Sequence, residues 1–199
     1  MLFINISSDK VYISTWTKNI FLDRNGIENI LWPQLIQLNQ KNKIKDILVL
    51  NWPWWFTNLR VSTLCINLLN ALQKNKIKIY DISKINLYSY LYKQKLIPRY
   101  WIIYIWQKKN IRLYDFAKQK YSTQTIQEVN LDEDYFLDQV YEKWYYTNLN
   151  SKFGLKIIYH KSWLEITFKS QKIQIKLKDL QLKPLKQIQP NYMIDPKMN

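Results

Sequence analysis

Glycine, histidine and cysteine are nearly absent from this chain of 199 residues. With only Gly26 and Gly154, the chain cannot form a GxxxxGK[ST] or GxGxxG loop, in which backbone N–H groups close around a phosphate. A zinc site takes three or four ligands, usually Cys and His, and the chain offers only Cys65 and His160. We read Cys65 as a small apolar residue of a helix and His160 as an ordinary strand or turn residue. A single cysteine also permits no internal disulfide, as is typical of a cytoplasmic protein.

Long apolar runs are also missing. No uncharged apolar stretch approaches the roughly 20 residues that a membrane-spanning helix needs. The first ten residues, MLFINISSDK, lack the basic leader and apolar core of a signal peptide. A hydrophobic core is nevertheless available, because 47% of the residues are hydrophobic and 16% are aromatic. These features predict a folded cytoplasmic protein without a membrane segment, built as one domain or two small subdomains.

Arginine is scarce although the chain is strongly basic. The formal net charge is +15, yet only four of the 30 basic residues are arginine: Arg24, Arg60, Arg99 and Arg112. An excess of positive charge attracts nucleic acid, whereas a dedicated reader of phosphates or bases uses the bidentate guanidinium of arginine. The abundance of Ile, Asn and Lys is also typical of an AT-rich genome. The charge therefore leaves a nucleic-acid partner and compositional drift as two open interpretations.

The order of predicted elements indicates an α/β chain. Three short strands, LFINI, KVYISTW and NIFLD, open the sequence. A predicted helix over 26–43, the buried strand DILVLNW, a helix over 58–74 capped by Thr57 or Asn58, and the buried strand KIKIYDI follow. This strand–helix–strand unit predicts parallel pairing. Further strands are predicted at 99–107, 110–117, 154–160, 163–169 and 172–178, with a helix at 131–146. We therefore expect mixed sheets with flanking helices in two subdomains, residues 1–97 and 98–199.

The segment from Lys45 to Ala71 reads KDILVLNWPWWFTNLRVSTLCINLLNA, a strand, a loop and a helix. It resembles the TsaB family, which has an apolar strand, a loop of the form G-x-G-P-G-S-F-T-G-L-R and a helix in this order. The matching loop and helix residues are Pro53, Phe56, Thr57, Leu59, Arg60 and Val61. The family's upstream helix, H-S-x-x-L-L-P-x-I-x-x-L, is matched at or near Leu31, Pro33, Leu35 and Leu38, and its terminal P-x-Y-L-R segment at Pro190 and Tyr192.

The resemblance implies the actin and sugar-kinase ATPase fold, a ribonuclease-H-like fold with two α/β subdomains. It also implies a non-catalytic subunit that holds no cofactor or metal and binds a TsaD-type catalytic subunit. That subunit transfers a threonylcarbamoyl group to the adenosine beside the anticodon of tRNA. A TsaE-type ATPase joins the same assembly, and tRNA is contacted indirectly through the complex. A homodimer in place of the heterodimer stays open.

The sequence departs from the family pattern at the nucleotide loop. The family glycines are replaced by Asn51, Trp54 and Asn58, and Asn5 stands where the ATPases of the fold use an aspartate. The indole rings of WPWWF fill the space that a phosphate needs, and a non-glycine residue at positive φ costs roughly 1–2 kcal/mol. We therefore expect the tryptophans of this loop to pack or to contact a partner, and we expect the chain neither to hydrolyse ATP nor to bind it tightly.

Both predicted N-terminal helices have wide apolar arcs. The arc of helix 58–74 covers roughly two-thirds of its circumference, whereas a helix resting on one sheet needs somewhat over 100°. Either another part of the chain or a partner must cover the excess. The family places its subunit interface on these helices, where two of them supply half of an intermolecular four-helix bundle. We therefore predict an interface that includes Ile27, Leu31, Leu35, Leu38, Leu59, Ile66 and Leu69, with Asn70 on the polar face.

Two other functions stay open. Interleaved aromatics and lysines, in NLYSYLYKQK and RYWIIYIWQKK, suit a stand-alone RNA-binding protein that stacks on unpaired bases. Half-buried tyrosines on alternating strand faces would give the same pattern. The third function is a ribonuclease-H-like enzyme, which needs carboxylates that converge on metal ions. Asp132, Glu133 and Asp134 are instead neighbours in a predicted helix, where adjacent side chains diverge.

Overall fold

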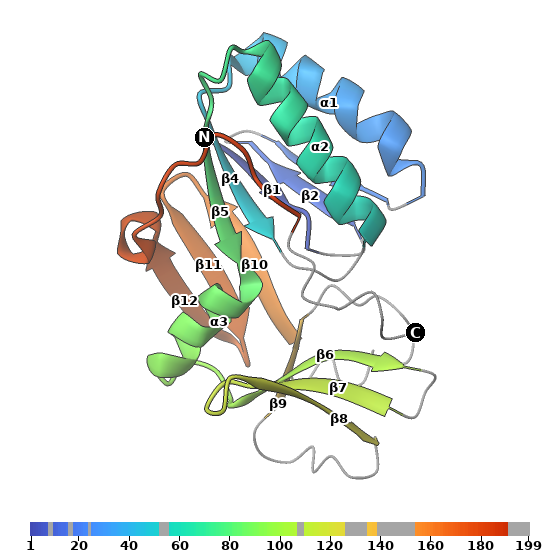
Figure 1. Ribbon diagram of the computed structural model, residues 1–199. Coiled ribbons are helices and arrows are strands. Elements are labelled where there is room, and N and C mark those ends of the chain that lie inside the picture. Colours follow the sequence, from blue (N-terminus) through green and yellow to red (C-terminus); the bar gives the residue numbers. More distant parts are fainter. Residues whose placement is uncertain are drawn as a thin grey trace. The chain divides into compact units, whose positions relative to one another are not determined.

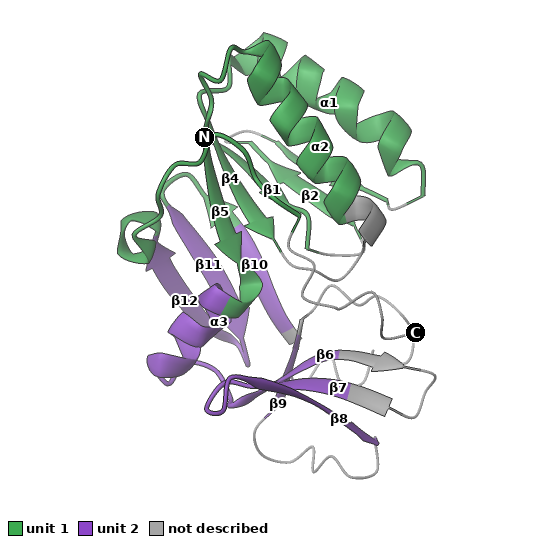
Figure 2. Cartoon of the chain, viewed as in Figure 1, with its two compact units in different colours: residues 1–85, 159–162, 177–199 green, residues 86–158, 163–176 purple. Residues whose placement is uncertain are grey.

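The computed structural model contains two compact units (Figures 1 and 2). It describes residues 1–7, 10–15, 18–23, 25–51, 56–106, 110–125, 135–138 and 154–190. Unit 1 consists of Met1–Ile85, Tyr159–Ser162 and Leu177–Asn199, and unit 2 of Asn86–Ile158 and Trp163–Lys176. This division differs from the expected one at residues 97 and 98, because the boundary falls inside a helix, α3 (Lys84–Lys93), and the C-terminal segment returns to unit 1.

The sheet of unit 1 has five strands in the order β3-β2-β1-β4-β5. They are β1 (Leu2–Asn5), β2 (Val11–Ser14), β3 (Asn19–Leu22), β4 (Asp46–Asn51) and β5 (Lys78–Ser83). β2 runs antiparallel to both neighbours, whereas β1, β4 and β5 pair in parallel. The parallel pairs are joined through α1 (Ile27–Asn42) and α2 (Phe56–Leu72), as the predicted strand–helix–strand unit requires. This strand order and direction are those of the ribonuclease-H-like fold.

The sheet of unit 2 repeats that arrangement. Its order is β12-β11-β10-β9-β6-β7-β8, with β6 (Tyr100–Trp106), β7 (Asn110–Asp115), β8 (Lys120–Thr125), β9 (Tyr135–Asp138), β10 (Gly154–His160), β11 (Trp163–Phe168) and β12 (Gln171–Lys176). β6, β7 and β8 form an antiparallel meander, and β9 and β10 add in parallel beside β6. β8-β7-β6-β9-β10 thus corresponds strand for strand to β3-β2-β1-β4-β5. Two such sheets in one chain confirm the predicted actin and sugar-kinase-like fold.

The core of unit 1 lies between its sheet and the two helices, which cover the same sheet face (Figure 1). Gly26 precedes α1 with φ 76°, a left-handed conformation that glycine adopts without steric cost. The helix then buries one residue per turn, at Ile27, Leu31, Leu35 and Leu38. Alternate strand residues, such as Ile4 and Val49, pack against these side chains in the same core cluster. Apolar side chains that recur about every 3.6 residues along the helices therefore pack against apolar side chains that recur every two residues along the strands. Together they form one apolar layer.

Three predictions about local structure are wrong. The predicted helix 131–146 contains the strand Tyr135–Asp138 instead, and its acidic residues at 132–134 lie outside the described residues. NLYSYLYKQK does not alternate as a strand, because most of it forms α3, which buries Leu87, Tyr88 and Leu91. Thr57 and Asn58 do not cap α2, since the helix already begins at Phe56.

Aromatic side chains form much of the core of unit 2. Trp101 of β6 is 1% exposed and meets the ring of Tyr88 edge-on at 4.8 Å. The ring of Phe136, on β9, stacks on Trp101 at 6.2 Å and meets Tyr88 edge-on at 5.3 Å. Such pairs add roughly 0.5–1.5 kcal/mol to the burial of their area. Trp101 belongs to the segment RYWIIYIWQKK. Its ring is packed in the interior of unit 2 and is not available to stack on a base.

Candidate functional site

The seven residues predicted to form a partner interface are buried inside unit 1. Ile27, Leu31, Leu35, Leu59, Ile66 and Leu69 are 0% exposed and Leu38 is 6% exposed. All seven belong to the core cluster beneath α1 and α2. A side chain enclosed by its own chain cannot contact a partner, so these residues are core residues and the prediction is wrong for them. The width of the apolar arc was apparent from the sequence, but which part of that arc faces the sheet was not.

The exposed part of the arc is a line of three leucines on α2. Leu64 is 68% exposed, Leu68 44% and Leu72 60%. Their spacing of four residues places them one above the other on a single helix face. The next residue after Leu68, Leu69, points into the core and is fully buried. We call Leu64, Leu68 and Leu72 the leucine stripe. It is an exposed apolar surface and a candidate for a protein contact.

A different side of α2 is covered by the chain's own C-terminal segment. The side-chain amide of Asn67 donates to the carbonyl of Ile188 at 2.9 Å and accepts from its backbone N–H at 3.0 Å. Asn70 donates to the carbonyl of Lys186 at 2.8 Å and accepts from the N–H of Ile77 at 2.9 Å. Asn70 is 0% exposed, so its predicted place on a solvent-facing polar side is wrong. Its polarity serves buried hydrogen bonds.

The residues that carry the family resemblance are only partly described. Pro53 lies outside the described residues, as do Tyr192 and the side chains of Phe56 and Thr57. Leu59 belongs to the core, and Arg60 is exposed on the first part of α2. The loop motif therefore contributes one core residue and one exposed cation to the described structure.

The carboxyl end of β1 is the position where the ATPases of this fold place an aspartate. Here the side-chain oxygen of Asn5 accepts from the backbone N–H of Ser7 at 3.0 Å and also from the Ser7 hydroxyl. The ammonium of Lys84 donates to the carbonyl of Ser7 at 3.1 Å, and Lys84 is 2% exposed. A neutral amide engaged by its neighbour supplies no charge for Mg²⁺, and a buried ammonium is not open to a phosphate from solvent. The absence of tight ATP binding stays a prediction, which a binding measurement tests.

The described residues hold neither a metal-ligating cluster nor an exposed thiol. Among the described residues, no three His, Cys, Asp or Glu side chains come together in a group that could hold a metal ion. Cys65 is buried, and burial raises the pKa of its thiol, which keeps it protonated and unreactive. Burial also raises the pKa of Asp81, which accepts a long hydrogen bond of 3.4 Å from the amide of Asn51. In the part of the chain that the structure describes, no helix has the length and apolar character to cross a membrane.

Comparisons with known proteins give no match by family model and none among curated proteins. Among solved structures, the chain is similar to YeaZ (TsaB) from Pseudomonas aeruginosa, with 16% identity over 74% of this chain and 78% of that chain and a TM-score of 0.38. A second structure, an uncharacterized protein with similarity to peptidase YeaZ from Pseudomonas aeruginosa, has 15% identity over 74% and 77% of the two chains and a TM-score of 0.39. The fold assignment itself comes from the strand order and directions of this chain.

Proposed function

We propose that this chain is a non-catalytic, TsaB-type subunit that binds a TsaD-type transferase in the threonylcarbamoyladenosine modification of tRNA. The leucine stripe of α2 forms part of the contact. The observation that carries the proposal is a row of large apolar side chains, 44–68% exposed, on a helix whose core side and Asn67–Asn70 side are covered by the chain itself. The sequence resemblance over Lys45–Ala71, which includes this helix, supports the choice of partner.

The energetics of the stripe favour a partner with a complementary apolar surface. Fully burying a leucine side chain contributes about 1.5–3 kcal/mol. A partner that buries the exposed parts of these three leucines would therefore gain several kcal/mol of binding free energy. Residues four apart form a ridge that fits the groove of another helix. α1 lies beside α2 (Figure 1), and two adjacent helices can complete a four-helix arrangement with two helices of the partner.

The end of β1 supports an accessory role. A catalytic ATPase of this fold needs a carboxylate for its metal ion, and this chain has Asn5, whose oxygen is taken by Ser7. The catalytic groups would then reside in the TsaD-type subunit, with a TsaE-type ATPase joining the assembly.

Charge placed on the leucine stripe tests the proposal. We expect Leu64→Glu and Leu68→Glu to leave the chain folded, because exposed positions tolerate substitution within about 0.5 kcal/mol. Affinity for the purified TsaD-type subunit, measured by calorimetry, should fall at least roughly thirtyfold, the effect of about 2 kcal/mol at a central contact. Gln94→Glu adds the same charge at an exposed position just after α3, outside both α1 and α2, and serves as the matched control.

Three results would contradict the proposal in different ways. Stripe variants that bind the transferase subunit as tightly as the unaltered chain would remove the stripe from the interface. A chain that self-associates, and becomes monomeric with Leu68→Glu, would assign the stripe to a homodimer. Nanomolar, sequence-selective RNA binding by the isolated chain, without affinity for the transferase subunit, would favour the stand-alone RNA-binding function.

A further inference from the structure

The hexapeptide QKNKIK occurs twice in the chain, at residues 40–45 and 73–78. The first copy ends α1 and leads into β4, and the second follows α2 and leads into β5. Because β4 and β5 are parallel neighbours, both copies lie at the same end of the sheet, where these two strands begin. The backbone N–H of Lys78 donates to the carbonyl of Lys45 at 2.9 Å, which joins the two copies directly. Two segments 33 positions apart thus become adjacent.

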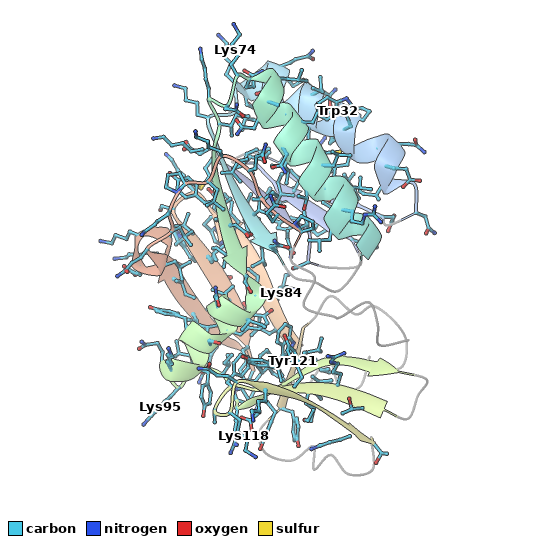
Figure 3. All side chains as sticks on the ribbon, viewed as in Figure 1. Trp32, Lys74, Lys84, Lys95, Lys118 and Tyr121 are labelled. Carbon is cyan, nitrogen blue, oxygen red and sulfur yellow. The ribbon has the colours of Figure 1, made fainter. Side chains whose placement is uncertain are left out.

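In each copy, an isoleucine packs against the core and fixes the position of the lysines on either side of it. Ile77 is 3% exposed, and the equivalent Ile44 packs against the same core cluster. The lysines before and after each isoleucine lie at the surface, although the backbone is left-handed at Lys43, which ends α1. All four of these lysines, at positions 43, 45, 76 and 78, are exposed. Lys74, in the second copy, also extends outward beyond α2 (Figure 3).

The paired copies line an open hollow of about 690 Å³. Lys43, Lys45, Lys76 and Lys78 contribute to its wall, together with the amides of Gln40 and Gln73. We call this feature the lysine hollow. Asp46 is the acidic residue of the lining, and the carboxyl ends of α1 and α2 each add roughly half a negative charge. Four ammonium groups outweigh these negative charges, so the hollow presents a net positive surface.

We infer that the lysine hollow binds the phosphate backbone of RNA without reading its bases. Lysine acts as a point charge toward phosphate, whereas base recognition mostly uses arginine or aromatic platforms, and neither type lines the hollow. The backbone advances at most roughly 7 Å over two residues, which is comparable with the spacing of successive phosphates. A concave, open surface accommodates a strand better than a flat layer of lipid headgroups. This inference does not depend on the proposed subunit role.

The test removes the hollow's charge and compares it with an equal loss elsewhere. The variant carries Lys43→Gln, Lys45→Gln, Lys76→Gln and Lys78→Gln. The control carries four Lys→Gln changes at exposed positions of unit 2, namely Lys93, Lys95, Lys118 and Lys156; Lys95 and Lys118 are labelled in Figure 3. Both lower the formal net charge from +15 by four. Binding of a labelled single-stranded RNA and of an unmodified tRNA transcript is followed by fluorescence anisotropy between about 50 and 200 mM salt.

We expect weak, salt-dependent binding by the unaltered chain. Each phosphate contact contributes about 0.7 to the slope of log affinity against log salt for a single strand, so four contacts contribute roughly 3. The hollow variant should lose most of that slope and bind at least about tenfold more weakly at the low salt limit, whereas the control should retain both. RNA sequence should not change the affinity.

Several outcomes would overturn the inference. Equal losses in the hollow variant and the control would show that RNA responds only to overall charge. If the unaltered chain does not bind RNA at low salt, RNA is not the ligand of the lysine hollow. Binding of vesicles made of phosphatidylcholine and phosphatidylglycerol that depends on the four lysines, without a matching effect on RNA, would assign the hollow to a membrane surface. Circular dichroism of both variants confirms that a loss does not come from unfolding.

Discussion

Two leucines on α2, five residues apart, should differ strongly in their contribution to stability. Leu69 is 0% exposed and Leu64 is 68% exposed. Leu→Ala at a buried site costs about 2–5 kcal/mol, because the transfer term of the lost methyl groups adds to that of the cavity left behind. Leu64 has removed only about a third of its surface from water, so its truncation should cost no more than about 1 kcal/mol. Alanine's slightly better helix propensity reduces this further.

Urea unfolding of the two variants measures this difference. A domain of this kind has a free energy of unfolding of about 5–15 kcal/mol, so Leu69→Ala should lower the transition midpoint substantially and Leu64→Ala only slightly. The dependence on urea should stay unchanged, which shows that both variants unfold from equally compact states. Losses equal within about 0.5 kcal/mol would mean that α2 does not present Leu69 to the core and Leu64 to solvent, and the leucine stripe would lose its basis.

Three further predictions concern buried polar groups and the end of β1. Asn70→Ala should lower the free energy of unfolding by at least about 2 kcal/mol, because the N–H of Ile77 and the carbonyl of Lys186 lose their partner; a loss below about 0.5 kcal/mol in urea titration would contradict those bonds. The two hydrogen bonds from Arg99, at 2.8 and 2.7 Å, lower the pKa of Asp115 below its ordinary value of 3.8. Its stabilisation is therefore complete above about pH 4 and is lost as the pH falls through the folded pKa, so the stability gap between the unaltered chain and Asp115→Asn should shrink in acid; a gap that is constant from neutral pH to about pH 2 would refute this. Calorimetry with ATP and magnesium should detect no tight binding, and micromolar affinity would overturn the interpretation of the β1 end.

The periodicity of the sequence was sufficient to predict most of unit 1. Strands and helices from residue 2 to residue 83 follow the predicted order, because each element is long enough to show its own apolar pattern. Local pattern failed where an element is short or where its partner lies far along the chain. Tyr135–Asp138 reads as part of a helix, yet it pairs in parallel with Tyr100–Ile102, and pairing with a distant strand overrides local propensity. No local signal could have revealed that pairing.

The leucine stripe and the lysine hollow also depend partly on the sequence and partly on the tertiary structure. The sequence by itself determined that α2 is apolar around most of its circumference and that QKNKIK occurs twice. Only the tertiary structure decided that Leu69 is buried while Leu68 is exposed, and that the polar Asn70 is enclosed by the C-terminal segment. A helical pattern fixes angles between side chains but not the rotation of the helix on its sheet. That rotation, and the parallel pairing that joins the two lysine-rich copies, arise from contacts between residues far apart in the chain.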